Sequence, residues 1–144
     1  MTSYSKPLSR LIDFSNQVLS NFSIAENPKS LYSPINYMLL NKGKKIRFMF
    51  SLLSYEMFGG KLEDLKEAAL SIELLHMFTL IHDDVMDNAS LRRGVQTINK
   101  KWSDNQAILS GDVLLIKSYQ YLLSSKLINK SSLKFFTDTA IKIC

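Results

Sequence analysis

Residues 61–94 read KLEDLKEAALSIELLHMFTLIHDDVMDNASLRRG, and this stretch decides the fold. Apolar side chains recur in it at steps of three and four residues, the spacing that keeps them on one face of an α-helix. The positions on this face are Leu62, Leu65, Ala69, Ile72, Leu75 and Phe78. Because neither glycine nor proline interrupts the pattern, it predicts one long helix from near Lys61 to at least Asp87.

Three aspartates and two arginines follow one another at the end of this predicted helix. Asp83 and Asp87 are four residues apart, so they project from one face, a turn apart. Two carboxylates in this arrangement can hold a hard divalent cation, and Arg92 and Arg93 can hold phosphate oxygens. Residues 80–94 therefore predict a site for a metal-complexed diphosphate. The short aspartate pattern on its own is also typical of a solvated helix end.

His76 lies on the same predicted face as these aspartates. His76, Leu80, Asp83 and Asp87 follow one another at steps of four, three and four residues and form one stripe. The rise of the helix separates His76 from Asp83 by roughly 10 Å along the axis. This position favours a role for His76 beside the aspartates, with an ordinary core or surface histidine as the alternative.

A second basic group lies upstream, in residues 43–47, GKKIR. Lys44 and Arg47 are three residues apart at the predicted start of a helix, where both can lie on one face. The first turn of a helix also offers backbone donors and a dipole that favour an anion. The segment therefore predicts a second anion-binding group, and a solvated basic turn is the alternative.

The remaining sequence is also helical in its pattern, so we predict an all-α fold, an antiparallel helical bundle formed by residues 1–144 as one domain. The predicted helices cover roughly residues 5–23, 33–41, 44–58, 61–87, 97–102 and 106–126, and a last one begins near Ser131. Pro34 is expected in the first turn of the second helix, and Gly43 at its end. We find no strand pair with hairpin chemistry.

Composition limits the compartment and the partners. The chain is 46% hydrophobic and 22% charged, as globular proteins are, and its formal charge is +5. This charge permits an anionic partner, but no basic stripe carries interleaved aromatic residues, which disfavours a nucleic-acid binder. The longest apolar runs are too short for a membrane span, and polar residues interrupt the N-terminal segment, so we expect no signal peptide and a cytoplasmic protein. The single cysteine, Cys144, excludes an intrachain disulfide.

Together these motifs resemble the trans-isoprenyl diphosphate synthase family, also called polyprenyl synthetases. The similarity rests on Gly-Lys-x-x-Arg at 43–47, on LLH at 74–76, on the full run 80–94 and on AILSGD at 107–112. It covers nearly the whole chain, from about Ser33 to the end. The chain departs from the family pattern at Phe48, where proline is usual, and at Gln96, where the family often has proline before the threonine.

The resemblance implies a partial isoprenoid-synthase-type helical shell around a central cavity, and a role for each motif. Asp83 and Asp87 would coordinate Mg²⁺ that bridges to the diphosphate of an allylic substrate. Asp84 would support them, and these three aspartates are the implied catalytic residues. Arg92 would bind the same diphosphate. The implied ligands of isopentenyl diphosphate, the second substrate, are Lys44, Arg47, His76 and Arg93.

The reaction implied by the resemblance is the condensation of the two substrates to a polyprenyl diphosphate. In this family the residues four and five positions before the first aspartate help to form the floor of the hydrocarbon pocket. Here they are Thr79 and Phe78. A phenylalanine at 78 favours a farnesyl- or geranylgeranyl-type product, and an ordinary core aromatic is the alternative. On an ideal helix Thr79 lies nearer the aspartate face than Phe78.

The family's second aspartate-rich motif has no counterpart, because Asp83-Asp84 is the one Asp-Asp pair in the chain. The resemblance therefore implies the N-terminal half of a larger enzyme, inactive alone, which associates with a C-terminal half or forms a homodimer at full length. A non-catalytic partner subunit is the main alternative. A terpene cyclase fragment fits less well because it does not need the second basic group. A metal phosphohydrolase, suggested by His82-Asp83, would need more histidines than this chain has.

Overall fold

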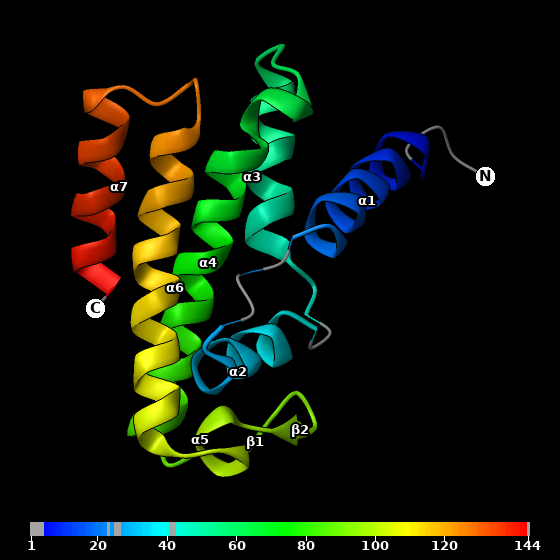
Figure 1. Ribbon diagram of the computed structural model, residues 1–144. Helices are drawn as coiled ribbons and strands as arrows, with labels where there is room; N and C mark the ends of the chain where they lie inside the picture. Colours follow the sequence, from blue (N-terminus) through cyan, green and yellow to red (C-terminus); the bar gives the residue numbers. More distant parts are fainter. Residues whose placement is uncertain (1–4, 23, 25–26, 41–42, 144) are drawn as a thin grey trace.

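The long helix α4 (Leu62–Met86) lies at the centre of the structure (Figure 1). The computed structural model describes residues 5–22, 24, 27–40 and 43–143. Buried side chains lie on several sides of α4, among them Ala69, Leu74, Met77 and Ile81. A helix that is apolar around most of its circumference must be covered by neighbours on all of those sides. The predicted long helix is confirmed, and it ends with Asp87 as its cap.

Helices α3 (Ile46–Met57) and α6 (Asp104–Ser124) flank α4 (Figure 1). Helix α3 packs on one side, and α6 on the other. Helix α1 (Ser5–Ser20) packs against α3, whereas α2 (Lys29–Leu40) and the short α5 (Ile98–Lys101) pack against α6. Helix α7 (Lys130–Ile143) lies beside α6 at the edge of the bundle. The prediction of an all-α helical bundle is confirmed.

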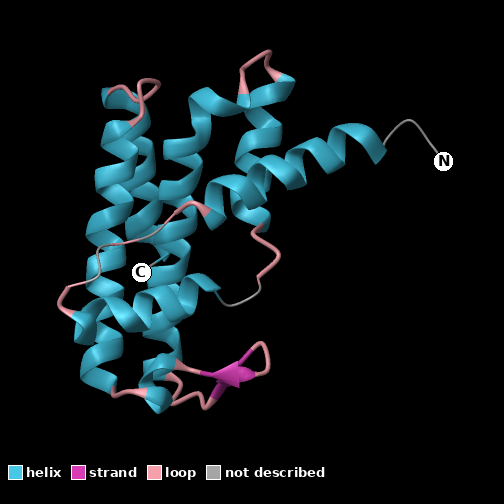
Figure 2. Ribbon diagram, turned by 45° about the vertical axis from the view of Figure 1, so that its right-hand side comes forward, coloured by secondary structure: helices cyan, strands magenta, loops and turns pink. Residues whose placement is uncertain are grey.

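A small β-hairpin lies between α4 and α5 (Figure 2). Its strands, β1 (Leu91–Arg92) and β2 (Val95–Gln96), are antiparallel, with Arg92 opposite Val95. The two turn residues have positive φ, 56° at Arg93 and 81° at Gly94, as a two-residue type I′ turn requires. The prediction that no hairpin exists was wrong, because strands of two residues are too short to show an alternating pattern.

Helix α2 begins at Lys29 rather than near Ser33, so Pro34 lies inside the helix and not in its first turn. Proline has no N–H, which leaves the carbonyl of Ser30 without its intrahelical donor. Helix α6 satisfies this part of α2, because Gln106 Nε2 donates to the Ser30 oxygen at 3.3 Å and Ser110 Oγ to the Leu31 oxygen at 3.2 Å. The junction before Gly43, where we expected the helix to stop, includes residues outside the described part of the chain.

Side chains from α2, α3, α4 and α6 form one hydrophobic core. Its fully buried members include Ile35, Phe48, Leu52, Leu74 and Leu114. Phe48, where sequences of the resembled family usually have proline, therefore fills volume that a smaller side chain would leave open. Among the described helices, none is both long and apolar enough to cross a lipid bilayer.

Candidate functional site

A cavity lined mainly by basic residues lies between the start of α3, the middle of α4 and the β-hairpin. Its volume is about 360 Å³, and we call it the cationic pocket; its lining residues are Gly43, Lys44, Lys45, Ile46, Arg47, Glu73, His76 and Arg93. This lining includes all four residues that the resemblance implied as ligands of isopentenyl diphosphate. They come from three separate segments of the sequence, and the fold gathers them around one space.

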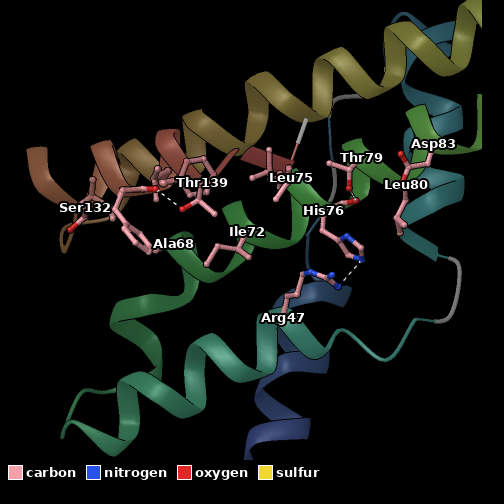
Figure 3. A pocket seen from close by; sticks show the side chains of 15 residues that line it. Arg47, Ala68, Ile72, Leu75, His76, Thr79, Leu80, Asp83, Ser132 and Thr139 are labelled. Atoms are coloured by element: carbon pink, nitrogen blue, oxygen red, sulfur yellow. Dashed lines mark hydrogen bonds between the residues drawn. The ribbon is translucent and has the colours of Figure 1, made fainter. Parts of the chain in front are cut away.

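Arg47 and His76, which both line this pocket, form a hydrogen bond, drawn as a dashed line in Figure 3, with 3.0 Å between Arg47 Nη1 and His76 Nε2. A guanidinium can only donate, so Nε2 must accept, and the proton of the neutral imidazole is on Nδ1. Burial and the nearby charge of Arg47 lower the pKa of His76 below its ordinary 6.5. His76 is therefore a neutral donor at neutral pH, with its Nδ1–H available to a ligand.

Lowering the pH from 7 to 5 should reduce the free energy of unfolding more in the native chain than in a His76→Gln variant. The pKa of His76 is lowered in the folded protein, so between that value and 6.5 the unfolded chain binds a proton that the folded chain does not. Stability therefore rises with pH through this window. Urea unfolding at several pH values measures the difference, and parallel pH dependences of the two proteins would contradict the lowered pKa.

Gly43 and Arg93 meet at the edge of the cationic pocket. The guanidinium of Arg93 occupies the space that a side chain at position 43 would need. Arg93 itself has φ 56°, a conformation that costs energy for a residue with a side chain and that recurs at functional sites. A side chain at position 43 would therefore have to push the flexible Arg93 guanidinium aside, a reason for glycine here that is distinct from the helix stop expected from the sequence.

A Gly43→Ala substitution should displace the Arg93 guanidinium and weaken pyrophosphate binding to the chain roughly tenfold, the effect of one lost charge-assisted hydrogen bond. Isothermal titration without metal measures this affinity. In an Arg93→Ala background the same glycine substitution should have little further effect, because the group that it displaces is gone. Additive losses in the double variant would show that Gly43 acts by another route.

The three aspartates of α4 have different surroundings. Asp83 and Asp87 are exposed. The backbone N–H of Asp87 donates to the backbone carbonyl oxygen of Asp83 at 2.8 Å, so the helical spacing continues through the cap. Asp84 is only 4% exposed and binds Arg92. Arg92 Nε lies 2.8 and 2.9 Å from the two carboxylate oxygens, and Nη2 lies 2.8 Å from Oδ1. This hydrogen bonding raises the pKa of Arg92 and fixes its guanidinium next to the exposed aspartates.

A larger, mostly apolar cavity of about 800 Å³ lies between α4 and α7 and reaches Asp83 (Figure 3). We call it the apolar pocket; its lining residues are Arg47, Ala68, Ile72, Leu75, His76, Thr79, Leu80, Asp83, Leu122, Ile128, Ser132, Phe135, Phe136, Thr139 and Ile143. From Asp83 to Ala68 it extends roughly 22 Å along α4, at the rise of an α-helix. Arg47 and His76 line both pockets, so the two cavities adjoin at these residues.

The two residues expected at the pocket floor point in different directions. Thr79 lines the apolar pocket. Phe78 is buried on the side of α4 that faces α6, and its ring packs edge-on against His82 with 4.6 Å between ring centroids. Helical geometry had placed Thr79 nearer the aspartate face, and the pocket lining agrees with that order.

The chain offers a metal ion two exposed carboxylates, at Asp83 and Asp87. No group of three or more histidine, cysteine, aspartate or glutamate side chains is arranged for metal binding in the described part of the chain. Mg²⁺ commonly takes one or two protein carboxylates and completes its octahedron with water and phosphate oxygens. The donor set present here therefore fits a magnesium ion that is shared with a diphosphate.

Two residues of the cationic pocket were missed in the sequence, Lys45 and Glu73. Lys45 Nζ lies 3.4 Å from Glu73 Oε1, and both side chains are largely buried. The signal that could have identified Glu73 is a lone carboxylate inside the apolar stretch of α4, three residues before His76 and so on its face. Lys45 stood within the quoted basic segment, and nothing in the sequence sets it apart from Lys44; its backbone conformation and its ion pair with Glu73 do so in the structure.

Comparison with known proteins shows which family this chain resembles in sequence and fold. The family model for polyprenyl synthetase matches residues 28–144. A short chain isoprenyl diphosphate synthase of Methanothermobacter thermautotrophicus is 38% identical over 120 residues, which are 81% of this chain and 37% of that protein. A crystal structure of a geranylgeranyl pyrophosphate synthase superposes with a TM-score of 0.81 at 35% identity, over all of this chain and 43% of that one.

A geranyltransferase from Helicobacter pylori, crystallised with magnesium and isoprenyl diphosphate, superposes with a TM-score of 0.74 at 28% identity. That match covers 95% of this chain and 48% of the other. This chain therefore spans less than half the length of each of these three proteins. The family model and the relatives agree over that span, and the chain belongs to the polyprenyl synthetase family.

Proposed function

We propose that this chain is the N-terminal, substrate-binding part of a magnesium-dependent trans-prenyltransferase that condenses isopentenyl diphosphate with an allylic diphosphate. The observation that carries the proposal is the junction at Arg47 and His76, where the cationic pocket adjoins the apolar pocket that Asp83 borders. An allylic substrate needs an apolar cavity beside groups that hold its diphosphate, and a second diphosphate needs its own cations. The two adjoining pockets offer both.

The cationic pocket is the proposed site of isopentenyl diphosphate. Lys44, Arg47 and Arg93 supply positive charge around a small cavity, and the Nδ1–H of neutral His76 adds a further donor. Arginine forks match phosphate oxygens in pairs, which orients the substrate as well as binding it. The shared residues Arg47 and His76 would then keep the isopentenyl double bond close to the apolar pocket.

The allylic diphosphate is proposed to bind where the apolar pocket ends at Asp83. Asp83 and Asp87 would hold the magnesium ions. Asp84 uses the Nε–H and one Nη2–H of Arg92, which leaves the other guanidinium donors free for phosphate oxygens. Asp84 thus supports the site through Arg92. When bound, magnesium would neutralise charge that develops on the departing diphosphate.

The chemistry follows from this arrangement. The allylic C–O bond breaks, and its electron pair leaves with the diphosphate, where Arg92 stabilises the growing negative charge. The isopentenyl double bond attacks the allylic cation, a carbon–carbon bond forms, and the resulting cation gives a proton to the released diphosphate. Ile72, Leu75 and Leu80 line the cavity for the hydrocarbon and keep water from the cation. Thr79 also lines this cavity, and we expect it to limit the chain length of the product, which would be a farnesyl, geranylgeranyl or longer diphosphate.

We propose that further polypeptide completes the site. Helix α7 packs along one edge, and Phe135 and Ile143, which line the apolar pocket from this helix, are 75% and 54% exposed, an apolar surface that another part of a larger fold would cover. That polypeptide would bring the second carboxylate cluster that the resemblance implies, and the full-length form would be a homodimer in the cytoplasm. A non-catalytic subunit of such an enzyme is the alternative, favoured by the two-carboxylate donor set of this chain.

Titration of the chain with isopentenyl diphosphate tests the proposal. Binding should occur without metal, and Arg47→Gln should weaken it at least about tenfold, because a charge-assisted contact is lost. Lys117→Gln, on α6 and outside the lining of both pockets, is the matched loss of one positive charge and should leave the affinity unchanged. Asp83→Asn should leave this metal-free binding intact and should remove the additional affinity for an allylic diphosphate that magnesium confers.

The outcomes separate the alternatives. Failure of the native chain to bind isopentenyl diphosphate would overturn the assignment of the cationic pocket. Condensation measured with radiolabelled isopentenyl diphosphate should be negligible for the chain alone. Turnover by the purified chain would contradict its dependence on further polypeptide. Binding of both substrates combined with stimulation of a separate catalytic chain would support the subunit alternative.

A further inference from the structure

Glu73 is the one acidic side chain among the residues that line the cationic pocket. It is 4% exposed, and its Oε1 lies 3.4 Å from Lys45 Nζ. Its other oxygen, Oε2, is buried and has no hydrogen-bond partner among the described residues. A buried carboxylate with one oxygen unsatisfied is costly, so its presence in a pocket for anions needs a reason.

The backbone conformation of Lys45 explains why Glu73 is buried in this pocket. Lys45 has φ 47° and ψ 37°, the left-handed conformation, and it caps α3 without any side-chain cap hydrogen bond. The left-handed conformation is energetically unfavourable for any residue with a side chain, whereas glycine adopts it without this penalty. Lys45 stands between Lys44 and Arg47, so its backbone angles set how these two side chains are presented to the pocket. The ion pair with Glu73 is the interaction that ties its side chain down.

We propose that Glu73 is a positioning residue of the cationic pocket: its ion pair with Lys45 holds the left-handed turn that presents Lys44 and Arg47 to a diphosphate. The inference rests on the proposed function for the identity of the ligand. Glu73 acts through the turn and does not contact the ligand. Its negative charge also balances a pocket that would otherwise bring several cations together without an anion.

Two double variants of equal net charge separate the effect of the backbone conformation at position 45 from the effect of the lost charges. Lys45→Gly with Glu73→Gln removes the ion pair but lets glycine adopt the left-handed conformation at no steric cost. Lys45→Ala with Glu73→Gln removes the same charges, but alanine still adopts the left-handed conformation only at an energetic cost. In titrations with inorganic pyrophosphate, without metal, the alanine pair should bind about tenfold more weakly than the native chain, and the glycine pair should stay within about threefold of it.

The φ angle at position 45, measured by NMR, gives a readout independent of any ligand. It should be positive in the native chain and in the glycine pair, and negative in the alanine pair. A positive φ in the alanine pair would overturn the positioning role, as would equal pyrophosphate affinities of the two double variants or tighter binding by Glu73→Gln alone. If the native chain fails to bind pyrophosphate, the proposed function of the pocket fails, whereas the φ angles still decide whether Glu73 holds the turn.

Discussion

Replacing Phe48 with alanine should lower the free energy of unfolding by about 4 kcal/mol, the largest loss that we expect from one side chain in this protein. Phe48 is fully buried at the start of α3, among side chains of the core cluster. Removing the ring loses its transfer free energy and leaves a cavity that the surrounding helices can only partly close. Urea unfolding followed by circular dichroism measures the change.

Phe50 supplies the matched control for this prediction. It lies two residues further along α3 and is 61% exposed, so it contributes little to the core. Phe50→Ala should change the free energy of unfolding by less than about 0.5 kcal/mol. Equal losses from the two substitutions would mean that α3 does not pack on the core as the structure describes.

Removing the guanidinium of Arg92 should cost about 3 kcal/mol of the free energy of unfolding. The Asp84 side chain is 6% exposed, and Arg92→Ala would leave its carboxylate buried without the two-pronged partner that it has now. An uncompensated buried charge is strongly destabilising, although the partial exposure of Arg92 places the expected loss at the lower end of the usual range. Chemical denaturation at neutral pH measures it.

Two further variants test whether the loss of stability comes from the burial of the Asp84 carboxylate. Adding Asp84→Ala to Arg92→Ala should recover part of the loss, because the stranded carboxylate is removed. Lys134→Ala breaks the exposed pair with Asp138 on α7, and should cost less than about 0.5 kcal/mol. A double variant as unstable as the sum of its single variants would contradict the coupling of Asp84 and Arg92.

Local spacing in the sequence determined the long helix and the aspartate stripe. An α-helix has a constant rise and twist, so the separation of Asp83 and Asp87 by four residues places them on one face whatever surrounds them. The same regularity predicted that Thr79 lies nearer to that face than Phe78, and the apolar pocket has that lining. Helix ends and short strands were less predictable, as α2 and the β-hairpin show.

Spacing and motifs alone were thus enough to predict that this protein is helical, which face of α4 carries the acidic groups and which family it resembles. The resemblance had implied one shared substrate for Lys44, Arg47, His76 and Arg93, and the packing of the helices shows that they line one pocket. The pairing of Asp84 with Arg92 and of Lys45 with Glu73 came from the packing alone. The physical reason is that helical periodicity acts over a few residues, whereas these contacts depend on how separate segments pack. Gly43, for example, makes room for an arginine that lies far from it in the sequence.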